Sequence, residues 1–102
     1  MQNKLLIIIP VLNEVNNILP IIKKIFKYLP GKKKHILFID DNSKDGTREK
    51  ILFAQKKFNK IYLIKRNSKL GIGSAHKVGL KFGFKKKYEK IITMDCDGTH
   101  NP

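Results

Sequence analysis

The stretch Leu5-Leu6-Ile7-Ile8-Ile9, with Pro10 after it, decides the fold that this sequence predicts. A short run that is continuously aliphatic, with no alternation of polar and apolar residues, is typical of a strand buried on both faces of a parallel sheet. Three more runs of this kind follow, at 36–39, 61–64 and 91–94. We therefore expect four strands in one sheet.

The segments between these strands have apolar residues at helical spacing. The first helix is expected to begin after Asn17, as its N-cap, and to stop at Pro30-Gly31. The second is expected over about 46–58, with Asp45 as its cap. The alternation of strands and helices predicts an α/β fold with parallel strands and right-handed crossovers. The third helix has a face small enough to pack closely on the sheet, made of Ala75, Val78, Gly79, Phe82 and Gly83.

The chain of 102 residues is 41% hydrophobic, which is enough for one domain with a modest core. No apolar run reaches the roughly 20 residues needed to cross a bilayer, and the first ten residues are too short and too strand-like for a signal peptide. The single cysteine, Cys96, cannot form a disulfide within the chain. We expect a cytoplasmic location, at most peripheral to the cytoplasmic face of the membrane.

The formal net charge of +14 allows three interpretations. The first is a coding bias, because isoleucine is over-used together with lysine. The second is attraction to an anionic membrane surface through two lysine clusters, at 32–34 and 85–87. The third, specific nucleic-acid binding, is disfavoured because Arg48 and Arg66 are the only arginines, whereas the recognition of bases and phosphates favours arginine.

Polar residues follow three of the four expected strands. In a parallel open sheet, ligands bind outside the carboxyl ends of the strands, near the point where the strand order reverses. We therefore expect the order 3-2-1-4, which would bring Glu14, Asp41 and Asp97 to one pocket. The adjacent carboxylates of Asp40 and Asp41 repel each other unless they are hydrogen-bonded or face a ligand. Asp41 is the better candidate to accept hydrogen bonds from a base or a ribose.

Asp95 and Asp97 lie two residues apart on an extended segment, so both carboxylates can point the same way while Cys96 points the opposite way. Hard oxygen ligands at this spacing suit Mg²⁺ or Mn²⁺ that bridges the phosphates of a nucleotide. Cys96 itself is expected to be a small buried side chain rather than a soft metal ligand.

Segment 70–75 contains Gly71 and Gly73 and resembles the start of a dinucleotide-binding fingerprint, but it lacks the third glycine and follows the third strand. An oxidoreductase of the Rossmann type is therefore disfavoured. The two glycines are expected to allow a tight start of the third helix beside a nucleotide. His35 and His76 are expected at the surface or in loops, whereas His100 lies close to the Asp pair and keeps a role in the site open.

Four segments together resemble the family 2 glycosyltransferases: Ile8-Ile9-Pro10-Val11-Leu12-Asn13-Glu14, Ile39-Asp40-Asp41-Asn42-Ser43-Lys44-Asp45-Gly46-Thr47, Leu70-Gly71-Ile72-Gly73-Ser74-Ala75 and Met94-Asp95-Cys96-Asp97. Within the family they are most similar to dolichol- or polyprenyl-phosphate mannosyltransferases. The resemblance covers almost the whole chain. It implies a GT-A fold, present here as a Rossmann-like half-domain of three layers with helices on both faces of the sheet. It also implies binding of a nucleoside-diphosphate sugar with a divalent cation, and transfer of the sugar with inversion.

The resemblance further implies roles for single residues. Leu12, Asn42 and Cys96 stand where an aromatic residue, glycine and alanine are common in the family, and these departures leave the nucleotide open. The implied nucleotide pocket is lined by Pro10, Leu12 and Glu14; the base or ribose is met by Ile39 and Asp41; the pyrophosphate is held by Asp95, Cys96 and Asp97, with Asp95 and Asp97 as metal ligands and Asp97 as the principal one.

The implied reaction transfers a hexose, mannose or glucose, from a GDP- or UDP-sugar to an acceptor such as polyprenyl phosphate. In the family, the acceptor-side residues follow the Asp-x-Asp motif. Residues 1–102 are therefore expected to be the nucleotide-sugar-binding domain alone, inactive by itself, as a fragment or as a natural truncation that works with a complementary chain. Two alternatives stay open, a non-catalytic nucleotide-binding remnant and a basic nucleic-acid-binding module.

Overall fold

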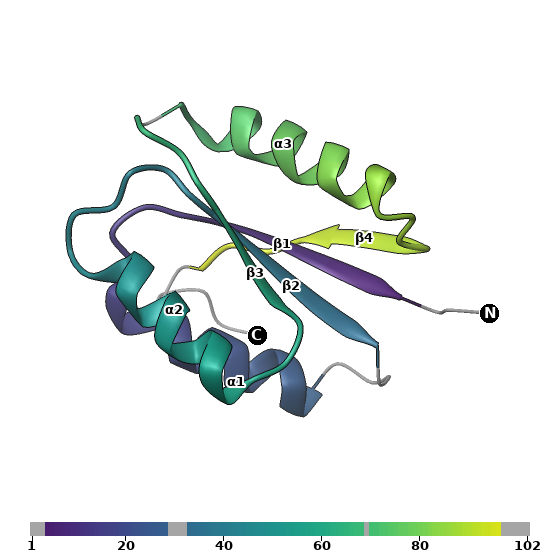
Figure 1. The fold of residues 1–102 in the computed structure, drawn as a ribbon, viewed down its shortest axis with the longest axis horizontal. Helices are drawn as coiled ribbons and strands as arrows, with labels where there is room; N and C mark the ends of the chain where they lie inside the picture. The colour runs from purple at the N-terminus through teal and green to yellow at the C-terminus, as the bar shows by residue number, and fades with distance from the viewer. Residues whose placement is uncertain (1–3, 29–32, 69, 97–102) are drawn as a thin grey trace.

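The computed structural model describes residues 4–28, 33–68 and 70–96, which form one four-stranded sheet between two layers of helices (Figure 1). The strands are β1 (Leu5–Val11), β2 (Lys34–Asp40), β3 (Ile61–Lys65) and β4 (Lys90–Thr93), in the order β3-β2-β1-β4. All neighbouring strands run parallel. The predicted α/β class and the predicted strand order are confirmed.

Helices cover both faces of the sheet, as predicted (Figure 1). A 3-10 turn, η1 (Val15–Asn17), leads into α1 (Ile18–Tyr28), and α1 lies with α2 (Thr47–Lys57) on one face. The other face is covered by α3 (Ile72–Lys85). None of the helices in the described ranges combines the length and the apolar composition that a membrane crossing requires.

β1 extends beyond the predicted run and includes Pro10, which has no N–H group to donate. Met94 N donates to Ile8 O at 2.9 Å, so the backbone of Ile8 faces β4, and that of Pro10, two residues further on, faces the same side. The pairing of β4 with β1 ends at Ile8, so the ladder on this side has already stopped before Pro10 would have to donate. β1 continues on the β2 side alone, as far as Val11 opposite Asp40.

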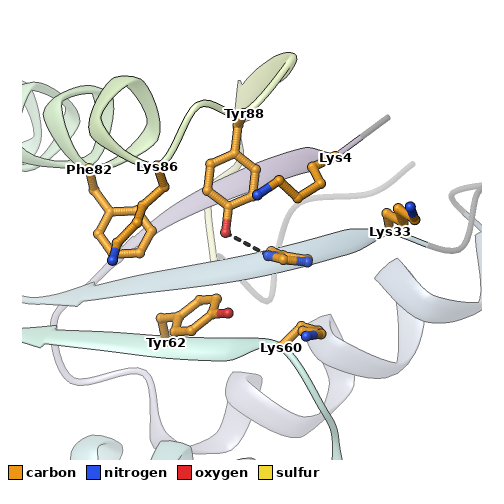
Figure 2. Close-up of a pocket in the computed structure, with 8 residues that line it drawn as sticks. Lys4, Lys33, Lys60, Tyr62, Phe82, Lys86 and Tyr88 are labelled. Atoms are coloured by element: carbon orange, nitrogen blue, oxygen red, sulfur yellow. Dashed lines mark hydrogen bonds between the residues drawn. The ribbon is translucent and has the colours of Figure 1, made fainter. Parts of the chain in front are cut away.

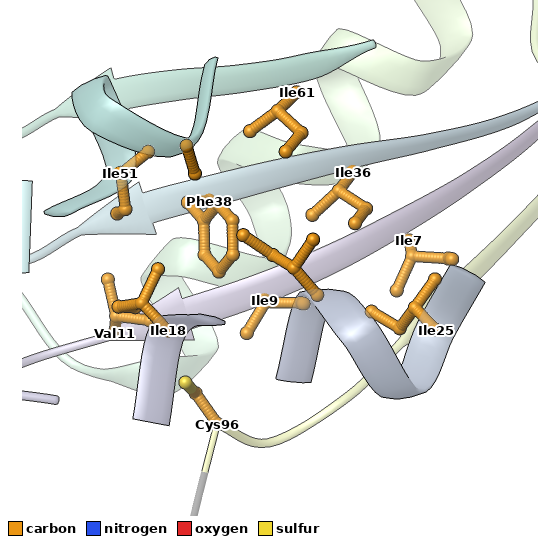
Figure 3. Close-up of a cluster of buried hydrophobic side chains, with 12 residues drawn as sticks. Ile7, Ile9, Val11, Ile18, Ile25, Ile36, Phe38, Ile51, Ile61 and Cys96 are labelled. Atoms are coloured by element: carbon orange, nitrogen blue, oxygen red, sulfur yellow. The ribbon is translucent and has the colours of Figure 1, made fainter. Parts of the chain in front are cut away.

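The larger core cluster lies between the sheet and the pair α1 and α2 (Figure 3). Successive strand residues point to opposite faces, so alternate residues of β1 and β2 meet these two helices. The cluster consists of Ile7, Ile9, Val11, Ile18, Ile22, Ile25, Ile36, Phe38, Ile51, Ala54, Ile61 and Cys96. Cys96 is thus a small buried core residue, as predicted.

The helix α3 lies very close to the opposite face of the sheet. A Cβ atom added at Gly79 would lie 2.7 Å from Cδ1 and Cγ2 of Ile8, and one added at Gly83 would lie 2.5 Å from Cδ1 of Ile91. Carbon atoms do not approach one another so closely, so a side chain at Gly79 or Gly83 would force the neighbouring isoleucine to shift. The predicted close approach of the third helix is confirmed. At Gly73, in contrast, an added Cβ would meet no described side chain within 4 Å apart from its chain neighbours.

Gly79→Ala is expected to lower the free energy of unfolding by about 1–3 kcal/mol, because the added methyl group overlaps the fully buried Ile8. Gly73→Ala is the matched control. It should leave the free energy of unfolding unchanged or raise it by up to about 1 kcal/mol, because alanine favours a helix over glycine. Urea denaturation followed by circular dichroism measures both variants, and equal effects would contradict the close packing.

Candidate functional site

The loops after β1 and β2 are joined by hydrogen bonds at the carboxyl edge of the sheet. Asn13 adopts a φ of 56°, a left-handed conformation that asparagine tolerates. Its N donates to Ser43 Oγ and its Oδ1 accepts from Lys44 N, each at 2.8 Å. Glu14 N donates to Thr47 Oγ1 at 2.9 Å. The two loops therefore form one continuous surface beside the ends of β1 and β2.

Two residues predicted as helix caps help to hold this surface. Asn17 precedes α1, and its Nδ2 donates at 2.7 Å to Oε1 of Glu14, one of the predicted nucleotide-lining residues. The N-cap of α2 is Gly46 and not the predicted Asp45, because the chain turns into the helix there with a φ of 95°. Asp45 precedes the N-cap by one residue and stabilises the start of the helix, because its Oδ1 accepts a hydrogen bond from Thr47 N at 3.0 Å.

Asp40, the last residue of β2, is fully buried and pairs with Arg48 of α2. Its Oδ2 also accepts from Asn42 N at 3.1 Å and from Ser43 N at 3.0 Å, whereas its buried Oδ1 has no hydrogen-bond partner among the described residues. Burial raises the pKa of this carboxyl, but hydrogen bonds from Ser43 and Arg48 outweigh burial and hold the pKa below its usual value of 3.8. Asp40 is therefore charged at neutral pH and ties β2 to α2.

Both carboxylate oxygens of Asp41 are engaged within the protein. Oδ1 pairs with the guanidinium of Arg66, whose Nε lies at 2.6 Å. Oδ2 accepts from Leu70 N at 3.2 Å and from Gly71 N at 3.0 Å. Arg66 also donates to Ser74 Oγ at 2.7 Å and to Gly71 O at 3.1 Å. This network ties the end of β2 to the start of α3, where Gly71 is the N-cap with a φ of 92°.

Arg48 and Arg66 belong to this site, although in the sequence alone they argued only against nucleic-acid binding. They are the only arginines among 22 basic residues, and each pairs with one of two adjacent aspartates. A planar guanidinium can donate parallel hydrogen bonds to groups in fixed positions, which an ammonium group cannot do. In a chain that otherwise uses lysine, the two arginines were a signal that could have located the site.

The residues predicted to line the nucleotide lie at different depths. Pro10, Leu12 and Glu14 are half-buried and follow one another along the end of β1. Asp41 is 7% exposed. Ile39 is fully buried in the core cluster under α3, so its side chain has no surface to offer a ligand in this conformation. The carboxyl edge thus gathers Pro10, Leu12, Glu14 and Asp41, and Ile39 lies beneath it.

Asp95 follows β4 and is exposed, while Cys96 points into the core. This alternation agrees with the extended Asp-x-Asp segment that the sequence predicted. Asp97, the predicted principal metal ligand, lies outside the described residues, as does His100. No group of three or more His, Cys, Asp or Glu residues that could hold a metal is found in the ranges 4–28, 33–68 and 70–96. The carboxylate of Asp95 is a hard ligand of the kind that Mg²⁺ and Mn²⁺ prefer, so this part of the site fits such an ion.

The switch point of the sheet lies between β1 and β4. The chain runs from β1 outward through β2 to β3, and then crosses to β4 on the other side of β1. In open parallel sheets, ligands bind outside the carboxyl ends of the strands at this point. The loop that follows Val11 and the exposed Asp95 flank it, and Asp41 lies on the far side of β1.

Asp40→Asn is expected to lower the free energy of unfolding at pH 7 by about 1–3 kcal/mol, because a charged acceptor of three hydrogen bonds is lost. The folded-state pKa of Asp40 is lowered, so its contribution is present above the usual pKa of 3.8 and is lost as the pH falls through the lower folded-state value. Urea unfolding from pH 7 to pH 2 should show the two proteins converging at the acid end. The exposed Glu49→Gln is the control, and a constant gap between wild type and Asp40→Asn would contradict the assignment.

Known proteins share the sequence pattern and the fold of this chain. Residues 6–102 match the model of the family described as Glycosyl transferase family 2. The chain is 34% identical over 100 residues to a polyprenol monophosphomannose synthase of Mycolicibacterium smegmatis, an alignment that covers 95% of this chain and 36% of that protein. It is 32% identical over 100 residues to a dolichol-phosphate mannosyltransferase of Saccharomyces cerevisiae, with coverage of 94% and 36%. The chain thus spans little more than a third of the length of these relatives.

The fold is also similar to that of a solved structure, a mannosyltransferase from Pyrobaculum calidifontis in complex with GDP-Man and Mn²⁺. The TM-score is 0.78 at 18% sequence identity, with coverage of 95% of this chain and 28% of that chain. At this identity the likeness concerns the fold, and it agrees with the predicted GT-A architecture. Since one family model matches nearly the whole sequence, from the first strand onward, this chain belongs to glycosyl transferase family 2.

Proposed function

We propose that this chain forms the donor-binding part of an enzyme that transfers a hexose, mannose or glucose, from a GDP- or UDP-sugar to polyprenyl phosphate. The observation that carries the proposal is the exposed Asp95 at the switch point of the sheet, where the loop after Val11 also begins, in a family 2 chain. The names of the relatives, polyprenol monophosphomannose synthase and dolichol-phosphate mannosyltransferase, support mannose as the sugar and a polyprenyl phosphate as the acceptor.

The donor would lie across the carboxyl edge, with its diphosphate near β4 and its base toward β2. Asp95 and Asp97 would hold Mg²⁺ or Mn²⁺, which supplies positive charge that stabilises the diphosphate as a leaving group. Between the diphosphate and the base, the donor would contact Pro10, Leu12 and Glu14. The hydrogen bond from the Asn17 amide would hold the Glu14 carboxylate in place for its contact with the donor.

The proposed transfer forms one bond and breaks one bond at the anomeric carbon of the sugar. An oxygen of the acceptor phosphate attacks C1 from the side opposite the diphosphate, the bond between C1 and the diphosphate oxygen breaks, and the nucleoside diphosphate leaves. The configuration at C1 is inverted. Because the acceptor phosphate is already an anion, it needs little help from a general base. The residues of this chain then act by holding the donor in line for attack.

The Asp41 network would give Arg66, Leu70 and Gly71 a role in donor binding. A base or ribose that donates to Asp41 would compete with the N–H groups of Leu70 and Gly71. Arg66 is 8% exposed and its side chain has three hydrogen-bond partners. Replacing Arg66 as a partner of Asp41 would therefore cost more free energy than replacing either N–H group. We infer that the donor displaces one of the loop N–H groups and leaves the pair of Asp41 with Arg66 intact.

The acceptor side of the cleft would be supplied from outside the residues described here, by the same polypeptide or by a complementary chain. The carboxyl edge described above is occupied by residues suited to the donor, and the match covers 36% of the length of each mannosyl-transferring relative. A polyprenyl phosphate acceptor would bring the enzyme to the cytoplasmic face of a membrane.

Asp97→Ala and Asp95→Asn are each expected to abolish the Mn²⁺-dependent binding of GDP or UDP, because the loss of one hard ligand leaves the diphosphate charge uncompensated. The free energy of unfolding of Asp95→Asn should change by less than about 0.5 kcal/mol, because this side chain is exposed. Calorimetric titration with Mn²⁺ and with EDTA measures the binding. Glu89→Gln, an exposed acid at the other end of the strands, is the charge-matched control.

Unchanged affinity in the Asp97 variant would overturn the metal assignment. If the wild-type chain bound neither nucleotide, the chain would be a purely structural remnant. Salt-sensitive binding of single-stranded RNA without metal would favour the nucleic-acid alternative.

Purified residues 1–102 are expected to bind the donor but to transfer no sugar, because the barrier falls only when the acceptor is held in line with C1. The assay is the transfer of radiolabelled mannose from GDP-mannose to a polyprenyl phosphate in detergent. Turnover by the chain alone would contradict the assignment of the acceptor side to residues outside it.

A further inference from the structure

A pocket of about 530 Å³ lies at the amino edge of the sheet, at the opposite end of the strands from the donor site. β1 has seven residues, so about 20 Å separate the two edges of the sheet. The residues that line the pocket come from the starts of the strands, from the end of α3 and from the turn after it (Figure 2). They are Lys4, Lys33, His35, Lys60, Tyr62, Phe82, Lys86 and Tyr88.

Four rings form a closed wall in this pocket. The ring centroids are 5.9 Å apart for His35 and Tyr62, 5.7 Å for Tyr62 and Phe82, 6.3 Å for Phe82 and Tyr88, and 5.1 Å for Tyr88 and His35. A hydrogen bond of 2.6 Å joins Nδ1 of His35 to Oη of Tyr88. The prediction that His35 lies at the surface or in a loop is wrong, because its ring is packed among these side chains in β2 and is 8% exposed.

The four lysines give the pocket a purely positive character. No acidic residue is among the eight described residues that line it. Lys4 Nζ lies 5.0 Å from the centre of the Tyr88 ring. Burial lowers the pKa of His35, and the positive charges of Lys60 and Lys4 lower it further. Both ammonium groups therefore act on the His35 ring inside the pocket. Burial raises the pKa of Tyr88 to about 12, so its phenol stays neutral.

We propose that this pocket is a second ligand site, which binds the phosphate of a phosphate ester or a pyrophosphate. Each ammonium group is a compact charge with three donors, suited to phosphate oxygens. The rings would pack against the part of the ligand next to the phosphate, and Tyr88 Oη and the His35 ring add polar contacts. The site uses neither Asp95 nor a metal, so this proposal can be tested independently of the proposed donor site. The phosphate could belong to a soluble compound or to the headgroup of a lipid.

The test is a titration with inorganic pyrophosphate in EDTA, which removes metal-dependent binding at the donor edge. The chain has no tryptophan, and two of its three tyrosines line the pocket, so tyrosine fluorescence reports on this site. Lys4→Gln with Lys60→Gln should weaken binding by about tenfold or more, because two charged hydrogen bonds are lost. Lys23→Gln with Lys56→Gln, on exposed positions of α1 and α2, removes the same charge and should weaken binding less than about twofold, because distant charges are screened.

Proton NMR of His35 gives a second readout that does not depend on a variant. A bound anion offsets the charges of Lys4 and Lys60, so the pKa of His35 should rise in the complex. An unchanged pKa under saturating pyrophosphate would place the anion elsewhere and overturn the proposal.

Sedimentation with vesicles distinguishes the two sources of phosphate. One set contains phosphatidic acid in phosphatidylcholine, and the other contains phosphatidylcholine alone. Saturable pyrophosphate binding that only the pocket pair of substitutions removes supports a soluble ligand. Vesicle binding that requires phosphatidic acid, and that only the pocket pair removes, supports a lipid headgroup. Absence of both kinds of binding, or equal loss in the two pairs, would show that the lysines are an ordinary solvated surface and overturn the proposal.

Discussion

Two carboxylates in adjacent positions at the end of a central strand place the strongest constraint on this structure. Asp40 is the last residue of β2, which has neighbours on both sides, and Asp41 follows it; they are 0% and 7% exposed. Neighbouring buried charges of one sign are tolerated only when each is compensated. Arg48 reaches Asp40 from α2 on one face, and Arg66 reaches Asp41 beside the start of α3 on the other. Compensation of these charges therefore fixes both helical layers against the same strand, and Arg48 Nη2, which donates to Arg66 O, links the two pairs.

Most of the fold could be predicted from the sequence because its determinants are local or follow general rules. Continuous aliphatic runs marked the strands, and the collection of acids after them was enough to predict the order of the sheet. The true end of β1 could not be predicted in this way. Pro10 is acceptable within β1 only because the pairing of β4 ends at Ile8, and this register is a property of the assembled sheet. The N-cap of α2 shifted from Asp45 to Gly46 for a related reason, since the backbone turn and not the capping side chain set the position.

In the site, too, features set by neighbouring residues were predicted and features set by residues far apart in the sequence were not. The alternation of Asp95 and Cys96 depends on neighbouring residues alone, and it was predicted. The partners of Asp41 and the burial of His35 were not, because the pairs that create them are 25 and 53 residues apart in the sequence. The two arginines could have been picked out from the sequence, because they are rare in a chain rich in lysine. No local sequence pattern predicted the contact between His35 and Tyr88. The role of Asp97 rests on the sequence and on family membership.

The parallel direction of all four strands has an electrical consequence. A residue placed before a strand lies at one end of the molecule and a residue placed after a strand lies at the other, so the position of a charge relative to the strands decides which end it occupies. Lys4, Lys60 and Lys90 precede or begin strands, whereas Asp40, Asp41 and Asp95 end or follow them. At about 0.15 M salt the screening length is about 8 Å, well below the roughly 20 Å between the edges, so the two ends act as separate electrostatic environments. At about 0.01 M salt the screening length grows to about 30 Å, and the charge of an anion bound at one end would then change the electrostatic potential at the other.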